Sequence, residues 1–252
     1  MITAVILTNN ENSKLLQCLE SLLWCQEIIV TSDSEKNEKT LNLIKRKGVK
    51  VYKNDLKKNF SQQRNFALER VSNNWALFID ADEIVSSKLK NEILGVFHNI
   101  NMDKKYNGFV FKRQDFFLGR WLKYGEASSV KLLRLGKKNT GKWKGKVHEV
   151  WDIKGRVGEF KNPIIHKRNI TISNFLTRIN IYSSLRADEL YQKKIKANFV
   201  TLFVYPIGKF IQNYSLKLGA LDGFPGFTLA FFMSLHSFLV RAKLYLLWKN
   251  ES

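Results

Sequence analysis

The chain has few cysteines, few acidic residues and no long uncharged apolar run. Cys18 and Cys25 are its only cysteines, and their spacing fits neither a paired zinc motif nor the framework of a disulfide-stapled secreted domain. We therefore expect a reducing compartment. Met1 is followed by a short apolar stretch without a basic n-region or a cleavage site. This pattern predicts a buried first strand rather than a signal peptide, and hence a cytoplasmic protein.

Acidic residues are outnumbered by basic ones. The 252 residues contain 42 Lys and Arg against 22 Asp and Glu, which gives a formal net charge of +20. Such a charge attracts polyanions, so nucleic acid, anionic lipid and phosphorylated substrates are all candidate partners. The basic residues are spread along the chain, which indicates a globular domain with a positive surface rather than a polybasic arm. A basic nucleic-acid-binding protein is therefore one alternative.

The N-terminal part alternates short apolar runs with stretches of helical periodicity, which predicts parallel strands joined by crossover helices. Gly48 suits a left-handed helix end, and Ser61 is the expected N-cap of the helix that follows. No G-x-G-x-x-G motif follows the first strand, which excludes a dinucleotide oxidoreductase. The expected strands of this part are residues 4–7, 27–30, 49–52 and 75–79.

The character of the sequence changes after Pro163. Strands at 109–113 and 131–135 and a region of strands and long loops precede it. Three helices are predicted after it, at residues 171–192, 199–218 and 227–248. We therefore expect an α/β domain over residues 1–168 and a helical C-terminal region over residues 169–252.

The last two predicted helices are strongly apolar. The longest uncharged run, residues 224–240, falls at the short end of the ~20 residues that a spanning helix needs. Basic residues flank these apolar stretches: Lys209, Lys217, Arg241 and Lys243. This arrangement favours helices that lie on an anionic bilayer surface over a membrane span. The alternative is that the helices pack on the first domain or on a second subunit, as in a homodimer.

Polar residues follow the predicted strands of the first domain, and ligands of open parallel sheets bind at the carboxyl ends of the strands. The fourth strand runs directly into Asp80-Ala81-Asp82-Glu83. Two carboxylates at this spacing can hold a hard divalent cation that bridges to phosphate oxygens. One alternative is an acidic loop that starts the next helix. Another is a phosphatase with Asp80 as nucleophile, although the downstream sequence lacks the second acidic cluster that this chemistry needs.

Several segments of the chain, in their order, resemble the motifs of family 2 glycosyltransferases. Those in the first part are residues 4–11, 27–33, 63–68 and 78–83. Later segments resemble the lipopolysaccharide core β-1,4-glucosyltransferase branch, at residues 117–121, 131–135, 147–149 and 178–183. The resemblance implies a GT-A nucleotide-diphospho-sugar transferase fold with a Rossmann-like mixed sheet, and an inverting mechanism. It also implies a nucleotide-diphospho-sugar donor, with a UDP-sugar favoured.

The resemblance also implies roles for individual residues. Asp82, together with Asp80, would bind Mg²⁺ or Mn²⁺. Arg64 would lie near the nucleotide, where a cation and a guanidinium stabilise the departing diphosphate; the alternative is that Arg64 is a surface helix residue. The expected nucleotide-sugar-binding residues are Thr8, Asn10, Glu11, Asp33, Gln63, Arg64, Asn65 and Asp80.

Inversion requires a base that removes the proton of the acceptor hydroxyl. We expect Glu149 to be this base, with Asp115 and Asp152 as alternatives. A carboxylate paired with Lys144 or Lys146 is the other interpretation of Glu149. The expected acceptor-binding residues are Arg113, Arg120, Trp121, Lys131, Arg134 and His148. Basic groups among them suit an anionic glycolipid or glycan, although each could equally be an ordinary surface or core residue.

Overall fold

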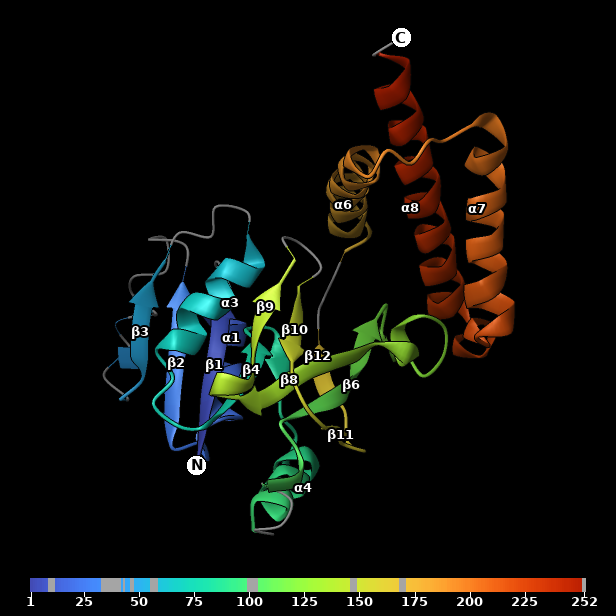
Figure 1. Ribbon diagram of the computed structural model, residues 1–252. Helices are drawn as coiled ribbons and strands as arrows, with labels where there is room; N and C mark the ends of the chain where they lie inside the picture. Colours follow the sequence, from blue (N-terminus) through green and yellow to red (C-terminus); the bar gives the residue numbers. More distant parts are fainter. Residues whose placement is uncertain are drawn as a thin grey trace. The chain divides into compact units, whose positions relative to one another are not determined.

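In the computed structural model the chain forms two compact units, which are described separately here (Figure 1). The first unit comprises Met1–Arg113 and Lys131–Lys167, and the second comprises Gln114–Val130 and Arg168–Ser252. The structure describes residues 1–8, 12–32, 42, 44–45, 48–54, 59–98, 104–145, 149–167 and 171–250.

The first unit is built on a mixed sheet with the strand order β3-β2-β1-β4-β8-β6-β12-β5. Strands β3, β2, β1 and β4 pair in parallel, whereas β8 runs antiparallel to both β4 and β6. The strands are β1 (Ile2–Thr8), β2 (Glu27–Ser32), β3 (Lys50–Lys53), β4 (Trp75–Asp80), β5 (Glu83–Ile84), β6 (Gly108–Phe117), β8 (Lys131–Lys137), β11 (Val157–Glu159) and β12 (Ile164–Lys167). The predicted α/β class and the four predicted parallel strands are confirmed.

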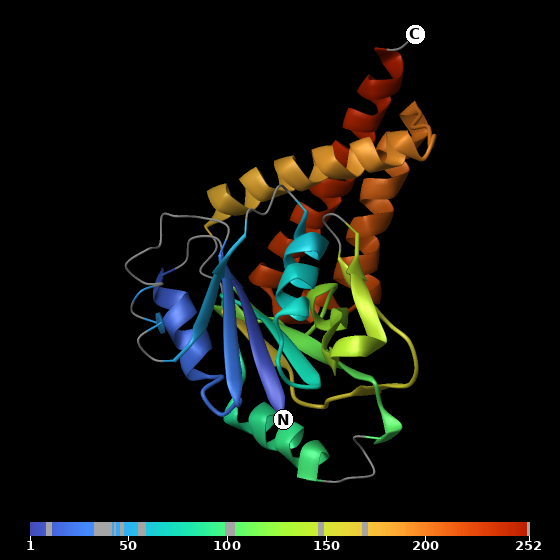
Figure 2. The same ribbon diagram turned by 60° about the vertical axis from the view of Figure 1, so that its left-hand side comes forward.

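Helices cover both faces of this sheet because alternate residues of each central strand are apolar. Val5 and Phe78 point toward α3 (Phe60–Glu69), where they pack with Ala67 and Leu68. Ile6, Leu77 and Ile79 point to the opposite face and pack with residues of α1 (Asn12–Glu20) and α4 (Ser87–His98). Figure 2 shows α3 in front of the sheet.

Two local predictions about helix ends have different outcomes. Gly48 has a φ of +80°, the left-handed conformation predicted for it. The N-cap of α3 is Asn59 rather than Ser61, because the Asn59 side chain accepts a hydrogen bond from the backbone N–H of Gln62. Ser61 lies inside the first turn and donates its hydroxyl to Asn59.

A hairpin of β9 (Gly141–Lys144) and β10 (Val150–Ile153) forms a separate two-stranded sheet. Side-chain packing, rather than backbone hydrogen bonds between strands, attaches this hairpin to the main sheet. The rings of Trp143 and Trp151 stack on each other, with centroids 5.2 Å apart, and both meet Phe78 edge to face. Gly136 of β8 makes room for the hairpin, since a Cβ there would lie 2.4 Å from Ile153 and 3.0 Å from Trp151.

The second unit consists of helices and one short segment. Helix α8 (Phe224–Lys249) packs against both α6 (Ile172–Gln192) and α7 (Phe199–Ile211). The predicted helix over 199–218 is α-helical only to Ile211, because a π-helical turn at Gln212–Leu216 and a 3-10 turn at Gly219–Asp222 connect α7 to α8. Among the described residues, α8 is the one helix whose length and composition would suffice to cross a membrane.

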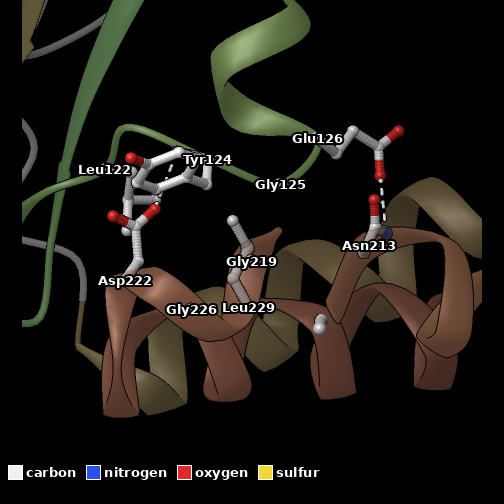
Figure 3. A pocket seen from close by; sticks show the side chains of 10 residues that line it. Leu122, Tyr124, Gly125, Glu126, Asn213, Gly219, Asp222, Gly226 and Leu229 are labelled. Carbon is white, nitrogen blue, oxygen red and sulfur yellow. Dashed lines mark hydrogen bonds between the residues drawn. The ribbon is translucent and has the colours of Figure 1, made fainter. Parts of the chain in front are cut away.

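The segment Gln114–Val130 groups with these helices, although the sequence placed it in the first domain. Its apolar side chains Phe117 and Leu122 pack with Ile179 and Phe232 of the helices. The Asp222 carboxylate accepts the backbone N–H groups of Lys123 and Tyr124, at 3.0 and 2.9 Å. Figure 3 shows Asp222 beside Tyr124. The segment also contains β7 (Arg120–Trp121), which pairs with the end of β6.

The cavity shown in Figure 3 lies between this segment and the α7–α8 connection. Its volume of about 10 Å³ leaves room for at most one water molecule. It is therefore no site for a sugar or a nucleotide.

Replacing Asp222 tests this attachment. Asp222 is 1% exposed, so Asp222→Ala leaves two backbone donors without their acceptor. We expect a loss of about 2 kcal/mol in the free energy of unfolding, measured by urea denaturation. Asp188→Ala, at an exposed position of α6, is the control and should unfold like the wild type. Equal stability of the two variants would contradict the role of Asp222.

Candidate active site

The carboxyl ends of the parallel strands form one edge of the sheet. The register places Thr8 beside Ser32 and Leu7 beside Asp80, so the ends of β1, β2 and β4 are neighbours. Thr8 is buried there. The other predicted residues of this edge, Asn10, Glu11 and Asp33, lie outside the described residues, as does His148.

Asp80 lies between two buried arginines. One carboxylate oxygen, Oδ1, accepts a hydrogen bond of 2.9 Å from Nη2 of Arg64, which comes from α3. The other, Oδ2, accepts one of 2.7 Å from Nη2 of Arg134, which comes from β8. The arginine side chains are 3% and 6% exposed, whereas that of Asp80 is 32% exposed. The three elements α3, β4 and β8 therefore meet at one carboxylate.

The charges of this cluster support one another. Burial alone would raise the pKa of Asp80, but the positive charges of Arg134 and Arg64 outweigh it and hold this pKa well below its usual range. Burial would likewise lower the pKa of Arg134, and the carboxylates of Asp80, Glu83 and Glu149 raise it instead. Asp80 is consequently an anion, and Arg134 a cation, at neutral pH.

Arg64 extends the cluster to Glu149, the predicted base. Its Nε donates a hydrogen bond of 2.9 Å to Oε1 of Glu149, and its Nη2 lies 2.9 Å from the same oxygen. The guanidinium also lies over the ring of Trp143, 4.6 Å from the centroid. The alternative of a surface position for Arg64 is therefore wrong. Glu149 pairs with Arg64, whereas Lys144 pairs with Asp152 at 2.6 Å.

Glu83 closes the turn that follows β4. Its Oε2 accepts the backbone N–H of Asp80 at 3.0 Å, and its side chain is 1% exposed. Burial and the neighbouring charge of Asp80 raise the pKa of Glu83. Its hydrogen bond to the backbone fixes the conformation of the turn and thus the position of Asp80.

Asp82 lies beside a histidine that the sequence did not single out. Oδ2 of Asp82 is 3.3 Å from Nε2 of His166, and both side chains are nearly buried. His166 comes from β12, where it pairs with Glu83 of β5. No sequence signal distinguishes this histidine, because its place beside Asp82 depends on strand pairing between residues far apart in the chain.

Asp82 and His166 are a second candidate pair of metal ligands beside the predicted pair of Asp82 and Asp80. Both oxygens of Asp80 accept hydrogen bonds from arginine, so Asp80 has partners other than the predicted metal ion. Asp82 and His166 offer one oxygen and one nitrogen donor, and Mn²⁺ accepts both kinds. No group of three His, Cys, Asp or Glu side chains converges among the described residues. Further ligands would come from the nucleotide, from water or from residues outside the described ranges.

Two of the predicted nucleotide-binding amides form hydrogen bonds with protein groups. Oε1 of Gln63 accepts a hydrogen bond of 2.7 Å from the side chain of Asn54. Asn65 donates to the carbonyl oxygen of Trp143 and accepts the backbone N–H of the same residue, both at 2.9 Å. Asn65 thereby fixes strand β9 to helix α3, which is a positioning role that the spacing of the sequence does not show.

The described residues among the predicted acceptor-binding set are divided between the two units. Arg134 belongs to the Asp80 cluster, and Lys131 pairs with Glu159 at 2.6 Å on the surface of the first unit. Arg120 and Trp121 belong to the second unit, where Arg120 donates to the carbonyl oxygen of Leu221 and Trp121 packs against Phe116. Arg113 lies in β6.

The first unit carries acids and buried arginines at the carboxyl edge of its sheet, and sequence comparison identifies the class of protein. The sequence model of glycosyl transferase family 2 matches residues 3–151, and the chain belongs to this family. Its mixed sheet, with parallel strands β3, β2, β1 and β4 beside antiparallel β8, agrees with the Rossmann-like mixed sheet expected from the resemblance. Membership of the family sets aside the phosphatase and the nucleic-acid-binding alternatives.

Similar proteins extend over nearly the whole chain. The lipopolysaccharide core biosynthesis glycosyltransferase LpsC of Rhizobium meliloti is 27% identical over 97% of this chain and 92% of its own length. An uncharacterised glycosyltransferase of Rickettsia typhi is 24% identical over 96% of this chain and 86% of its own. A solved structure of S. aureus TarS 1–349 in complex with UDP is 13% identical and covers all of this chain and 92% of its own, with a TM-score of 0.48.

The position of the hairpin should matter for catalysis. Asn65→Ala removes both hydrogen bonds to the backbone of Trp143 and loosens the hairpin that continues to Glu149. We expect kcat of sugar transfer to fall by up to about 100-fold while the affinity for the nucleotide is retained. Steady-state kinetics and calorimetric UDP titration measure the two quantities. The control is Gln62→Ala, at an exposed position of the same helix; equal kcat in both variants would contradict the prediction.

Proposed function

We propose that the protein is an inverting glycosyltransferase that moves a sugar from a nucleotide-diphospho-sugar to a lipopolysaccharide core or another envelope glycan. The observation that carries this proposal is the continuous set of contacts from Asp80 through Arg64 to Glu149 at the carboxyl edge of the sheet. A UDP-sugar is the favoured donor, and glucose is the sugar suggested by the resemblance. The nucleotide would lie against the ends of β1 and β2, near Thr8, Asn10, Glu11 and Asp33.

Glu149 is the proposed base. The acceptor hydroxyl oxygen attacks the anomeric carbon, the bond from that carbon to the diphosphate oxygen breaks, and the hydroxyl proton passes to the Glu149 carboxylate. Oε1 of Glu149 lies 2.9 Å from Nη2 of Arg64. The same arginine contacts Asp80, so base and donor site share one rigid support.

Mg²⁺ or Mn²⁺ is the proposed cofactor, with Asp82 and His166 as its protein ligands. The ion would supply positive charge for the diphosphate as it leaves. The positive charges of Arg64 and Arg134 already balance the negative charge of Asp80, without a metal ion. Asp82 and His166 lie next to each other, with Oδ2 of Asp82 3.3 Å from Nε2 of His166.

The proposed acceptor is an anionic glycolipid or glycan at the inner face of the cytoplasmic membrane. The net charge of +20 favours an anionic partner, and the similar protein LpsC is named for lipopolysaccharide core biosynthesis. The enzyme would be cytoplasmic and peripheral, and nucleic acid is not an expected partner. A homodimer through the apolar helices is the alternative use of the second unit.

Removing the base tests the reaction. Glu149→Gln keeps the size of the side chain but cannot accept the acceptor proton, so we expect kcat of transfer to fall by about 100-fold or more. UDP affinity should stay within about twofold, because Glu149 contacts the acceptor in this mechanism rather than the nucleotide. Asp152→Asn, at the exposed carboxylate that pairs with Lys144, is the matched control. Full activity of Glu149→Gln would assign the base to another residue.

Removing a metal ligand tests the ion site. In Asp82→Asn and His166→Ala we expect Mn²⁺ to lose its effect on UDP affinity, measured by calorimetric titration with and without the ion. Electron paramagnetic resonance of Mn²⁺ should show at least tenfold weaker binding in the presence of UDP. Asp152→Asn again serves as control. Wild-type Mn²⁺ binding in both variants would place the ion elsewhere.

A further inference from the structure

Helix α7 presents one apolar face that no described part of the chain covers. Its exposed apolar residues recur at intervals of one, three and four positions, which places them within an arc of about 140° at 100° per residue. Their exposures range from 47% to 74%. The face consists of Phe199, Val200, Phe203, Val204, Ile207 and Ile211.

The charged side chains near this face form contacts with other groups of the protein. The segment from Phe199 to Val240 contains only three charged residues. Lys209 forms an ion pair with Glu126 at 3.0 Å, Lys217 donates to the hydroxyl of Ser129, and Asp222 accepts backbone N–H groups. The α7 face therefore carries no exposed charge along its length of about 20 Å.

A cluster of lysines stands at the N-terminal end of the same helix. Lys193, Lys194 and Lys196 are exposed and lie between α6 and α7, where Lys193 also pairs with Glu189 at 2.6 Å. The Nζ of Lys196 lies 5.3 Å from the ring centroid of Trp248, whose indole donates to the carbonyl oxygen of Ile195. Lysines beside an aromatic residue at the end of an apolar face are a composition typical of a helix that binds an anionic bilayer surface.

We infer that the α7 face docks on the surface of an anionic lipid bilayer, with α7 parallel to the membrane plane and the lysine cluster among the lipid headgroups. The charge complementarity between the lysines and anionic headgroups selects this occupant. Only the choice of membrane, the one that carries the acceptor, rests on the proposed function. It names α7, rather than the longer α8, as the element that contacts lipid.

The packing of α8 explains why that helix does not cross the bilayer. Helix α8 lies against α6 as well as α7. Helix α6 carries Arg186 and Glu189, which pair with each other at 2.6 Å and are 42% and 39% exposed. A spanning α8 would draw these charges into the hydrocarbon, which is costly. A helix lying on the surface leaves them in water.

Vesicle flotation of the full-length protein tests the inference. Wild-type protein should float with vesicles of equal parts phosphatidylcholine and phosphatidylglycerol, and at least tenfold less with pure phosphatidylcholine. Phe203→Glu combined with Ile207→Glu should reduce binding to the mixed vesicles at least tenfold. Ser173→Glu with Thr177→Glu adds the same charge to exposed positions of α6 and should bind like the wild type. Gln in place of Lys193, Lys194 and Lys196 should remove the preference for anionic lipid.

A second measurement does not depend on the charged variants folding. A fluorophore on Val204→Cys should shift its emission to shorter wavelength when mixed vesicles are added, and one on Thr177→Cys should not; the native Cys18 and Cys25 are buried. Unchanged vesicle binding of the Phe203/Ile207 variant, or no shift at Val204, would overturn the inference. So would a wild-type dimer in the absence of lipid that this variant converts to a monomer. UDP binding by the wild-type protein is measured in parallel. If the wild type does not bind UDP, the result counts against the proposed function rather than against membrane docking.

Discussion

The ion pairs between Asp80 and the two arginines are the interaction on which the site depends. Asp80 ends β4, the last of the four parallel strands, and Arg64 and Arg134 reach it from a helix and from the neighbouring antiparallel strand. Breaking one partner of a buried ion pair leaves an uncompensated charge, which typically costs about 3–5 kcal/mol. Helix α3 and strands β4 and β8 are thus held together at one point by charged side chains, which are rare in protein interiors. The catalytic geometry and the packing of the first unit are for this reason difficult to separate.

Arg64 links Asp80 to Glu149, the proposed base. Its guanidinium contacts Asp80 on one side and Glu149 on the other, while its flat face lies over Trp143. A planar cation with several fixed donors can do this, whereas the single charged group of a lysine cannot. The hairpin next to Glu149 is therefore positioned by Arg64 of α3, the helix that covers one face of the sheet. Asn65, the next residue along, adds the backbone contact that fixes the register of β9.

The sequence predicts the parts of this arrangement that are local. Apolar strands that end in polar residues identified β1, β2 and β4, and the acidic turn after β4 follows directly from its position. Contacts between distant segments could not be predicted in the same way. Arg134 and His166 lie in short strands whose pairing decides what their side chains meet. Asn65 and Gln63 have the right residue type for a ligand, but their amide groups bond to the protein. The segment Gln114–Val130 was assigned to the first domain because its neighbours in sequence are there, while its buried contacts are with the helices.

The central claim is that a nucleotide diphosphate binds at the carboxyl end of β4, against an ion held by Asp82 and His166. A crystal structure of the protein with UDP and Mn²⁺ tests it most directly. We expect Mn²⁺ to be coordinated by Asp82, His166 and oxygens of the diphosphate, with Asp80 still held by both arginines. Nucleotide bound away from this edge, or Mn²⁺ bound without Asp82, would contradict it.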